Sequence, residues 1–423
     1  MDKRVVITGI GVVSANGLDT ETYWKNLFSG KSYVAYDEHM NAIGAKSKVN
    51  CKINDFNWEM LSKKYGYKNL EDEARFIKLS LISGSKAIED SGLEETGYNE
   101  NDCGVVFASA IGGTPTFERV YKNLLDKETG VLKYKPIGNY FYNAGMLSYP
   151  ACILGEKYGF RNICTAISTG CTGGIDALGM AFDLIKNGKA KVIMANASEA
   201  PLADITYATL DSIGALCTAE GPYATRSRPF DLTRAGFVIG EGAGAIIVEE
   251  LEHALERKAH IYGEVLAYES GNNARHMTDL TGEGEALTKL ILSAMKHAGL
   301  TNEQIEYINA HGSSTKQNDL YETLAFKNAF GEGACKINIS STKSMLGHSL
   351  ASASMMGIIA ILGSFKYNII HPTANLQNED PECDLNYTPN ISQNRIVNNA
   401  MITASGFGGI HSVGIFGKYR KDI

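Results

Sequence analysis

Short, nearly continuous runs of apolar residues, separated by longer segments of helical periodicity, constrain the fold of this chain more than any other feature. The runs rich in Val and Ile cover residues 5–8, 104–107, 191–197, 244–248 and 305–309. A strand with one solvent-exposed face alternates apolar and polar side chains, whereas these runs indicate strands buried on both faces. Because helices must supply that cover, the pattern predicts an α/β fold.

The clearest helix lies between Ser168 and Gly188. Its apolar residues recur at steps of three and four, at Ile175, Leu178, Phe182 and Ile185. This is the spacing of one helix face. We expect the side chains of Ser168 and Thr169 to cap its first turn.

The order of elements in the first part of the chain recurs in the second. A strand ends at residue 309, a loop holds His311, a helix covers residues 319–329, and a strand, a loop and a helix after Gly347 follow. We therefore expect two related halves, residues 1–250 and 251–423. The apolar stretch 350–365 has 16 residues, three of them serine, and is shorter than the roughly 20 residues that cross a bilayer. We expect it to be a buried helix and the protein to lie outside membranes.

Charge and cysteine content exclude further classes of protein. The 423 residues include 40 Lys and Arg against 47 Asp and Glu, a net charge of −7, which argues against nucleic-acid binding. The eight cysteines form no Cys-x-x-Cys pair and no zinc-ligand spacing with histidine, so we expect no metal site. With no signal-peptide core at the N-terminus, we expect a cytoplasmic protein whose thiols are reduced.

One glycine motif resembles the start of a dinucleotide fingerprint. Gly9 and Gly11 follow the first apolar run, but Ser14 stands where the third glycine belongs and no clear helix opens after it. We therefore expect a tight structural turn and no nucleotide site.

Cys171 is the first candidate for chemistry. It follows Ser168-Thr169-Gly170 and precedes Thr172-Gly173-Gly174, so it lies at the start of the expected helix. Unpaired amides and the helix dipole there favour the thiolate and lower a cysteine pKa from its free value of roughly 8.5. The alternative is an inert buried thiol.

Two histidines and a lysine lie in loops at expected strand ends. They occur in Asn309-Ala310-His311-Gly312 and in Lys343-Ser344-Met345-Leu346-Gly347-His348. Side chains converge on ligands at strand ends of α/β sheets, although each histidine alone is more typical of a structural residue. A buried lysine needs a partner, for which we expect Glu322, eleven residues beyond His311.

Near the C-terminus, Ser405-Gly406-Phe407-Gly408-Gly409 forms a glycine-rich segment. Its glycines permit backbone angles that aim an amide N–H into a site as an oxyanion donor. A simple tight turn is the alternative.

Cysteine with histidine is typical of a Cys-His hydrolase, but two histidines and a lysine fit carbon–carbon bond formation better. In that chemistry the cysteine holds an acyl thioester. The enolate formed when a malonyl thioester loses CO2 then needs two N–H donors, which two histidines supply.

The chain resembles the β-ketoacyl synthases of the thiolase-like superfamily over residues 5–416. The resemblance is carried by Cys171, the two histidine motifs, Gly406-Phe407-Gly408-Gly409, Arg228-Pro229-Phe230-Asp231, Gly236-Phe237 and Gly240-Glu241-Gly242-Ala243-Gly244. It implies a five-layered α/β/α/β/α fold built from two similar halves, with Cys171 in one half and the histidines in the other.

Within that family the chain is most similar to the ketosynthase α subunit of bacterial type II aromatic polyketide synthases. Segments 168–172, 315–319, 347–350, 372–376 and 381–385 carry this finer match. Fatty-acid elongation synthases are the alternative, but they usually have an aromatic residue where Ser405 stands. We expect the smaller serine to admit a bulkier chain beside Cys171.

The resemblance implies roles for the nucleophile and its oxyanion hole. Cys171 would accept the growing chain from an acyl carrier protein. The amides of Cys171 and Phe407 would bind the oxyanion, and the Phe407 side chain would act as a gate between the two half-reactions.

It also implies roles for the second half. His311 and His348 would promote decarboxylation of the malonyl thioester, and Lys343, balanced by Glu322, would order the site electrostatically. No metal or organic cofactor is implied, because the phosphopantetheine arm belongs to the carrier protein.

Two partners are implied as well: the acyl carrier protein and a homologous chain-length factor that lacks the cysteine. A non-catalytic chain-length factor is itself a rival interpretation of this chain, but such a protein has no need of Cys171, both histidines and Lys343. Lys63, Lys64 and Lys68 are candidates for a local basic docking patch, the alternative being an ordinary solvated surface run.

Overall fold

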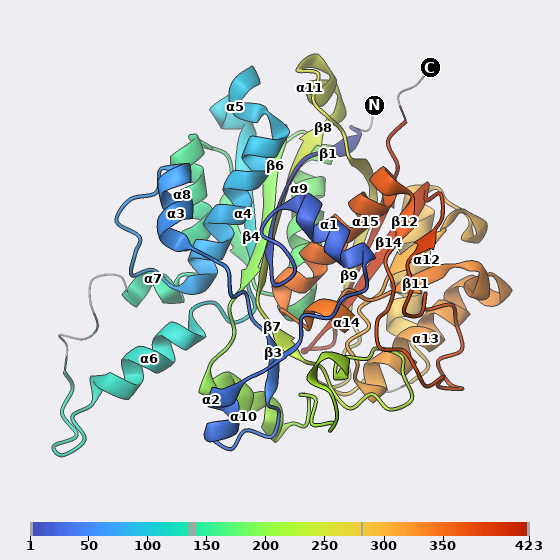
Figure 1. Cartoon of the computed structure of the whole chain (residues 1–423). Helices are drawn as coiled ribbons and strands as arrows, with labels where there is room; N and C mark the ends of the chain where they lie inside the picture. Colours follow the sequence, from blue (N-terminus) through green and yellow to red (C-terminus); the bar gives the residue numbers. More distant parts are fainter. Residues whose placement is uncertain (1–2, 134–136, 138–140, 281, 421–423) are drawn as a thin grey trace.

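The computed structural model describes residues 3–133, 137, 141–280 and 282–420 (Figure 1). Its centre is a sheet whose ten described strands have the order β11-β10-β14-β15-β9-β1-β8-β6-β4-β5. The strands of the first half are β1 (Val5–Ser14), β4 (Cys103–Ala108), β5 (Cys164–Ile167), β6 (Val192–Glu199) and β8 (Gly242–Glu250). Those of the second half are β9 (Gly263–Asn272), β10 (Tyr307–Asn309), β11 (Asn338–Ser340), β14 (Asn399–Gly406) and β15 (Ile410–Gly417).

The two halves of the sheet have the same topology. In the first half, β4 is parallel to β5 and β6, whereas β8 is antiparallel to β6 and β1. In the second half, β10 is parallel to β11 and β14, whereas β15 is antiparallel to β14 and β9. The halves are joined where β1 pairs with β9. The five runs that predicted strands all lie in or overlap strands of this sheet.

Helices form three layers around the two half-sheets, which gives the five layers implied by the family resemblance (Figure 1). Helices α4 (Arg75–Ser91) and α8 (Tyr149–Tyr158) cover one outer face, and α12 (Glu285–Ala298), with α13 (Lys316–Phe330) beside it, covers the other. The middle layer consists of α9 (Gly173–Lys186) and α15 (Ala351–Tyr367), which contact strands of both halves. As predicted, residues 351–365 of α15 are buried.

Shorter elements complete the chain. The helices are α1 (Thr20–Phe28), α2 (Glu38–Ala42), α3 (Trp58–Tyr65), α5 (Leu93–Thr96), α6 (Thr114–Leu124), α7 (Phe141–Gly145), α10 (Asp204–Ser212), α11 (Leu251–Glu256) and α14 (Lys343–Leu346). The strands are β2 (Ala35–Tyr36), β3 (Val49–Cys51), β7 (Ile239–Gly240), β12 (Ile369–Ile370) and β13 (Gln393–Asn394). In the described part of the chain, no helix is long and apolar enough to cross a bilayer.

The prediction of a tight turn at Gly9 and Gly11 is wrong, because both residues lie inside strand β1. A Cβ atom at Gly11 would lie 1.9 Å from the carbonyl oxygen of Ser83, and one at Gly9 would lie 2.3 Å from that of Ala87. The glycines therefore let helix α4 approach the strand closely. The turn comes later, where Ser14 and Gly17 exchange backbone hydrogen bonds.

The expected capping by Ser168 and Thr169 is also wrong. Helix α9 begins at Gly173, and its N-cap residue, Thr172, makes no side-chain cap hydrogen bond. The hydroxyls of Thr169 and Thr172 instead donate to the carboxylate of Asp176, because that buried acceptor lies one turn into the helix.

Candidate active site

Cys171 lies in a 3-10 turn, η3 (Gly170–Thr172), between strand β5 and helix α9. The turn depends on Gly170, whose φ of +65° is in the left-handed region. Cys171 is half-buried and lies at the N-terminal end of α9, where amide N–H groups lack intrahelical acceptors.

Helix α9 is held against α15, the helix that follows His348. The Gly174 N–H donates to Ser354 Oγ at 3.1 Å, and a Cβ at Gly174 would lie 2.4 Å from the backbone nitrogen of Met355. The contact thus fixes the position of the Cys171 turn relative to the His348 loop.

His311 follows strand β10, and its loop is held by a buried carboxylate. Glu322, on α13, accepts the N–H groups of His311 and Gly312 at 2.7 and 2.8 Å. The hydroxyl of Thr403, on β14, donates to the same carboxylate at 2.5 Å. Burial raises the pKa of Glu322 to about 7, so its charge depends on these donors.

Lys343 does not meet Glu322 in a direct ion pair, contrary to expectation. Its Nζ donates to the carbonyl oxygen of His311 at 2.6 Å, so the His311 backbone lies between the two charged groups. Glu322 and Lys343 therefore hold opposite ends of one residue. Burial lowers the pKa of Lys343 to about 8, while the charge of Glu322 opposes that shift.

His348 presents one nitrogen to the site. The Leu350 N–H donates to His348 Nδ1 at 3.2 Å, so the neutral ring carries its proton on Nε2. Leu350 makes this bond with a φ of +46°, a strained angle for a residue with a Cβ. The requirement for this angle was not predictable from a leucine in the sequence.

The two imidazoles are neighbours and neutral. Their ring centroids lie 5.2 Å apart, with the planes inclined at 78°. Burial lowers the pKa of both His311 and His348 well below the ordinary value, and the charge of Lys343 lowers both further. Nδ1 of His311 is buried and has no hydrogen-bond partner among the described residues.

The expected low pKa of Cys171 is not found. Burial raises the pKa of the thiol to about 12; the charge of Lys343 lowers it, and Glu199 raises it. Desolvation of a thiol placed between two sheets outweighs the stabilisation of the thiolate by the helix terminus. The resting thiol is therefore neutral.

Cys171, His311 and His348 line a single cavity of about 810 Å3. Side chains from both parts of the chain therefore share one chamber. The wall also includes apolar residues of α10 and of residues 276–280, namely Ile205, Leu210, Met277 and Leu280. Lys343 and Glu322 do not reach the cavity surface; they lie behind His311.

The Phe407 loop closes another side of this cavity. A Cβ at Gly406 would lie 3.4 Å from the Cys171 amide nitrogen, so the loop lies directly beside that amide. Phe407 lines the cavity with 46% of its surface exposed. Ser405 also lines it, and its hydroxyl lies 2.8 Å from Nδ1 of His411.

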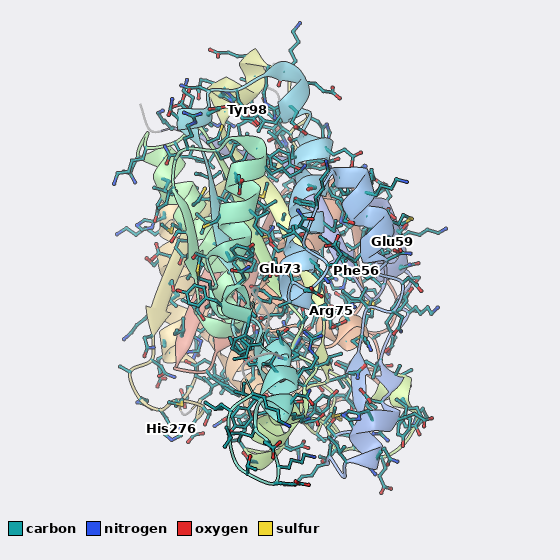
Figure 2. The ribbon with its side chains drawn as sticks, turned by 90° about the vertical axis from the view of Figure 1, so that its left-hand side faces the viewer. Phe56, Glu59, Glu73, Arg75, Tyr98 and His276 are labelled. Atoms are coloured by element: carbon teal, nitrogen blue, oxygen red, sulfur yellow. The ribbon has the colours of Figure 1, made fainter. Side chains whose placement is uncertain are left out.

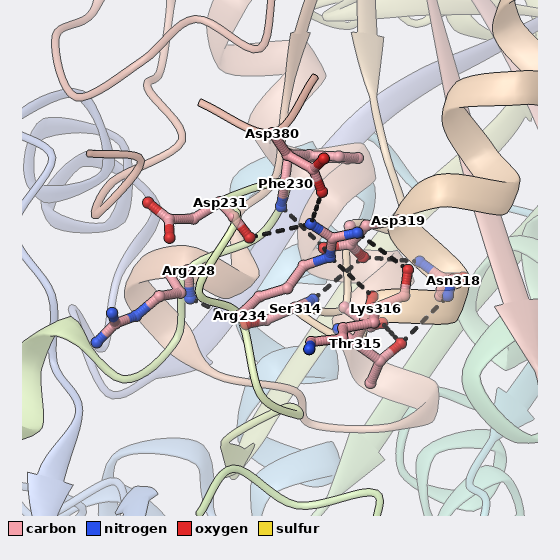
Figure 3. A network of polar contacts seen from close by, with 12 residues as sticks. Arg228, Phe230, Asp231, Arg234, Ser314, Thr315, Lys316, Asn318, Asp319 and Asp380 are labelled. Carbon is pink, nitrogen blue, oxygen red and sulfur yellow. Dashed lines mark hydrogen bonds and ion pairs between the residues drawn. The ribbon is translucent and has the colours of Figure 1, made fainter. Parts of the chain in front are cut away.

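A buried ionic network supports the loop after His311 (Figure 3). Arg234 pairs with Asp380 at 2.5 Å and with Asp319 at 3.6 Å, and it donates to the carbonyl oxygens of Thr315 and Lys316 at 3.3 and 3.0 Å. Arg234 was not predictable as a site residue from its own neighbourhood, although it lies just after the motif that ends at residue 231.

The lysines of the candidate docking patch lie elsewhere. Lys64, on α3, is paired with Glu89 at 3.0 Å, and no described residue of α3 belongs to the cavity wall. Figure 2 shows Glu59 of α3 and His276 of the cavity wall on opposite sides of the view. The docking role of these lysines therefore stays a prediction. Among the described residues, no group of three or more His, Cys, Asp or Glu is arranged to hold a metal ion.

The doubled five-layer architecture, with a cysteine and two histidines in one chamber, defines the thiolase-like class of condensing enzymes. Two family profiles match the chain: "Beta-ketoacyl synthase, N-terminal domain" over residues 2–254 and "Beta-ketoacyl synthase, C-terminal domain" over residues 262–377. The chain belongs to the β-ketoacyl synthase family.

Relatives cover nearly the whole chain. The tetracenomycin polyketide synthase ketoacyl synthase alpha subunit of Streptomyces glaucescens is 34% identical over 99% of this chain and 98% of its own length. The 3-oxoacyl-[acyl-carrier-protein] synthase 2 of Synechocystis is 37% identical over 99% of both.

Solved structures of ketosynthases also match this chain over nearly its whole length. A type II polyketide synthase acyl-carrier protein in complex with its ketosynthase bound to the hexaketide matches with a TM-score of 0.92 and 36% identity, over 99% of this chain and 100% of that one. The ishigamide ketosynthase/chain length factor matches with a TM-score of 0.90 and 28% identity over the same shares.

Proposed function

We propose that this chain is the ketosynthase α subunit of a type II polyketide synthase. It catalyses decarboxylative Claisen condensation of a malonyl-carrier thioester with a chain held on Cys171. The observation that carries the proposal is the single cavity that Cys171, His311 and His348 line together.

In the first half-reaction Cys171 Sγ attacks the thioester carbonyl of an acyl-carrier protein. The amides of Cys171 and Phe407 bind the oxyanion, which is supported by the position of Gly406, where an added Cβ would lie 3.4 Å from the Cys171 amide nitrogen. The new S–C bond replaces the carrier's, and the thiol proton leaves with the carrier's phosphopantetheine thiol. The charge of Lys343 stabilises the developing thiolate.

In the second half-reaction the malonyl-carrier thioester enters the same cavity. Its carbonyl oxygen accepts N–H bonds from His348 Nε2 and from His311 while the C–C bond to CO2 breaks. The carbanion then attacks the acyl group on Cys171, and the thiolate leaves and takes up a proton from solvent, which replaces the one lost with the carrier thiol in the first half-reaction. Neutral imidazoles suit this step, because they stabilise an enolate as donors without holding the malonyl carboxylate in an ion pair.

We infer that residues 1–250 and 251–423 are related halves, each contributing part of this site. The shared strand order and the shared pattern of parallel and antiparallel pairing support the inference, as do the separate profile matches to residues 2–254 and 262–377. On this division the first half supplies the nucleophile, and the second supplies both histidines, Lys343 and Phe407.

The partners we propose are an acyl carrier protein and a chain-length factor. Structures of a carrier protein with its ketosynthase and of a ketosynthase/chain length factor, both matching over 99% of this chain, support them. Strand β5 is the outermost strand of its half-sheet, and its four residues are half-buried, which suits pairing with a homologous subunit. We place the protein in the cytoplasm, since its eight cysteines are free thiols.

A fatty-acid elongation synthase is the second candidate, and the 37% identity to the Synechocystis enzyme favours it. That enzyme class works as a homodimer, whereas the ketosynthase α subunit needs a cysteine-free homologue. Ser405 at the cavity wall supports the polyketide assignment. The chain is therefore purified alone and after co-expression with its genomic neighbours. An active homodimer from the chain alone would indicate the fatty-acid enzyme, whereas activity only with a co-purified cysteine-free homologue would indicate the polyketide subunit.

The direct test supplies malonyl-carrier protein to the purified protein and its co-expressed partner. We expect polyketone products and an acyl adduct on Cys171, both found by mass spectrometry. Cys335→Ser, a change at an exposed cysteine, is the matched control and keeps both. Hydrolysis of simple thioesters without condensation would overturn the proposal in favour of a cysteine hydrolase.

A further inference from the structure

Asp176 is a buried carboxylate that the mechanism above does not use. It lies in the first turns of helix α9, five residues after Cys171, and only 4% of its surface is exposed. Within the described part of the chain, its side-chain hydrogen-bond partners are four uncharged hydroxyl groups. A carboxylate with its four lone-pair sites can accept all of them.

One oxygen of this carboxylate holds the nucleophile turn. The hydroxyls of Thr169 and Thr172 both donate to Asp176 Oδ2, the latter at 2.7 Å. These residues stand two positions before and one position after Cys171. The backbone that carries the thiol and its amide is therefore tied to Asp176 on both sides.

The other oxygen accepts hydrogen bonds from two strands in the second half of the sheet. Tyr268 Oη, on β9, donates to Asp176 Oδ1 at 3.0 Å, and Ser412 Oγ, on β15, donates to it at 2.5 Å. A Cβ at Gly179 would lie 2.3 Å from the Tyr268 ring. The glycine thus makes room on α9 for the tyrosine to reach the carboxylate.

Strand β15 begins directly after the Phe407 loop. A tie from Asp176 to Ser412 therefore sets the position of that loop relative to the Cys171 turn. The two amides assigned to the oxyanion hole belong to these two segments, which come from different halves of the chain.

We propose that Asp176 is a positioning residue that fixes the Cys171 amide and thiol relative to the Phe407 amide. The proposal rests on the proposed function. A misplacement of about 1 Å at reacting groups can reduce a rate by roughly 100-fold. Loss of these hydrogen bonds to Asp176 lowers the rate of acyl transfer to Cys171. It does not lower the rate of decarboxylation, which depends on the histidines.

The test compares these two half-reactions in the co-purified protein. Acylation of Cys171 by acetyl-carrier protein is followed by mass spectrometry, and CO2 release from malonyl-carrier protein is measured separately. Asp176→Asn keeps the shape but turns one acceptor into a donor that faces hydroxyl donors. We expect acylation to fall roughly 10- to 100-fold, with CO2 release within about 3-fold of wild type.

Two milder variants guard against misfolding of Asp176→Asn. Tyr268→Phe and Ser412→Ala each remove one hydroxyl from Oδ1 and are expected to lower acylation selectively, by a few fold. Asp183→Asn, at an exposed position on the same helix, is the matched control and leaves both rates unchanged.

The outcomes separate this inference from the function on which it rests. A wild-type protein that neither acylates nor decarboxylates overturns both. An active wild type whose folded variants lose both rates in parallel, or lose neither, overturns the role of Asp176 alone.

Discussion

Replacing Gly174 with alanine places a methyl group where helices α9 and α15 approach most closely. The new Cβ would lie 2.4 Å from the Met355 backbone nitrogen and 2.8 Å from Ser354 Oγ, whereas ordinary contact begins near 3.4 Å. The backbone nitrogen cannot rotate away, so the helices must separate by about 1 Å locally. Since α9 follows Cys171 and α15 follows His348, the same displacement separates the two halves of the site.

We expect Gly174→Ala to lower condensation roughly 100-fold, since a 1 Å misplacement has an effect of that order. Overpacking should also lower the free energy of unfolding by about 1–3 kcal/mol. The assays are condensation of malonyl-carrier protein at saturating substrate and urea denaturation. Gly333→Ala is the control, because a Cβ there would meet no atom of the described residues within 4 Å. Condensation within about 3-fold of wild type would refute the idea that this helix contact sets the geometry.

Three further tests address the site. Cys171→Ser should abolish the acyl adduct seen by mass spectrometry while CO2 release from malonyl-carrier protein continues; loss of both would show that the half-reactions do not divide as proposed. Ser405→Phe should shorten or block chain growth, and Ser405→Ala should not, because only the larger side chain fills the cavity; unchanged products from both would contradict this. Burial lowers the folded-state pKa of Lys343 from 10.5 to about 8, so between these pH values the unfolded chain binds more protons and stability rises with pH. From pH 8 to 10.5, the unfolding free energy of wild type should therefore rise by about 3 kcal/mol relative to that of Lys343→Met. Denaturant titration measures both values. A difference between the two proteins that stays constant over this pH range would argue against a desolvated lysine.

Prediction from sequence succeeded where the structure depends on a local residue pattern. The Val- and Ile-rich runs identified strands, and the apolar stretch after Gly347 identified the buried helix α15. It failed at Gly9 and Gly11, because a glycine can allow either a tight turn or the close approach of a helix. Only the position of α4 shows that these two glycines allow the close approach.

At the candidate site, prediction from sequence identified Cys171, His311 and His348, which line one cavity, but not the residues that support them. Glu322 was expected to pair with Lys343, yet it holds the backbone of His311 instead. Arg234 and Asp176 were not identified as supports, because their partners lie far away in the sequence and no local pattern marks them.

Residue chemistry and spacing alone therefore identified the candidate reactive groups: a thiol at the start of a helix and imidazoles at strand ends, each recognisable within a few neighbouring residues. Only the tertiary structure decided their electrostatic state. Cys171 was expected to have a low pKa and has one of about 12, because desolvation depends on everything that surrounds a group. That environment is built from residues hundreds of positions apart, and no stretch of sequence around Cys171 contains it.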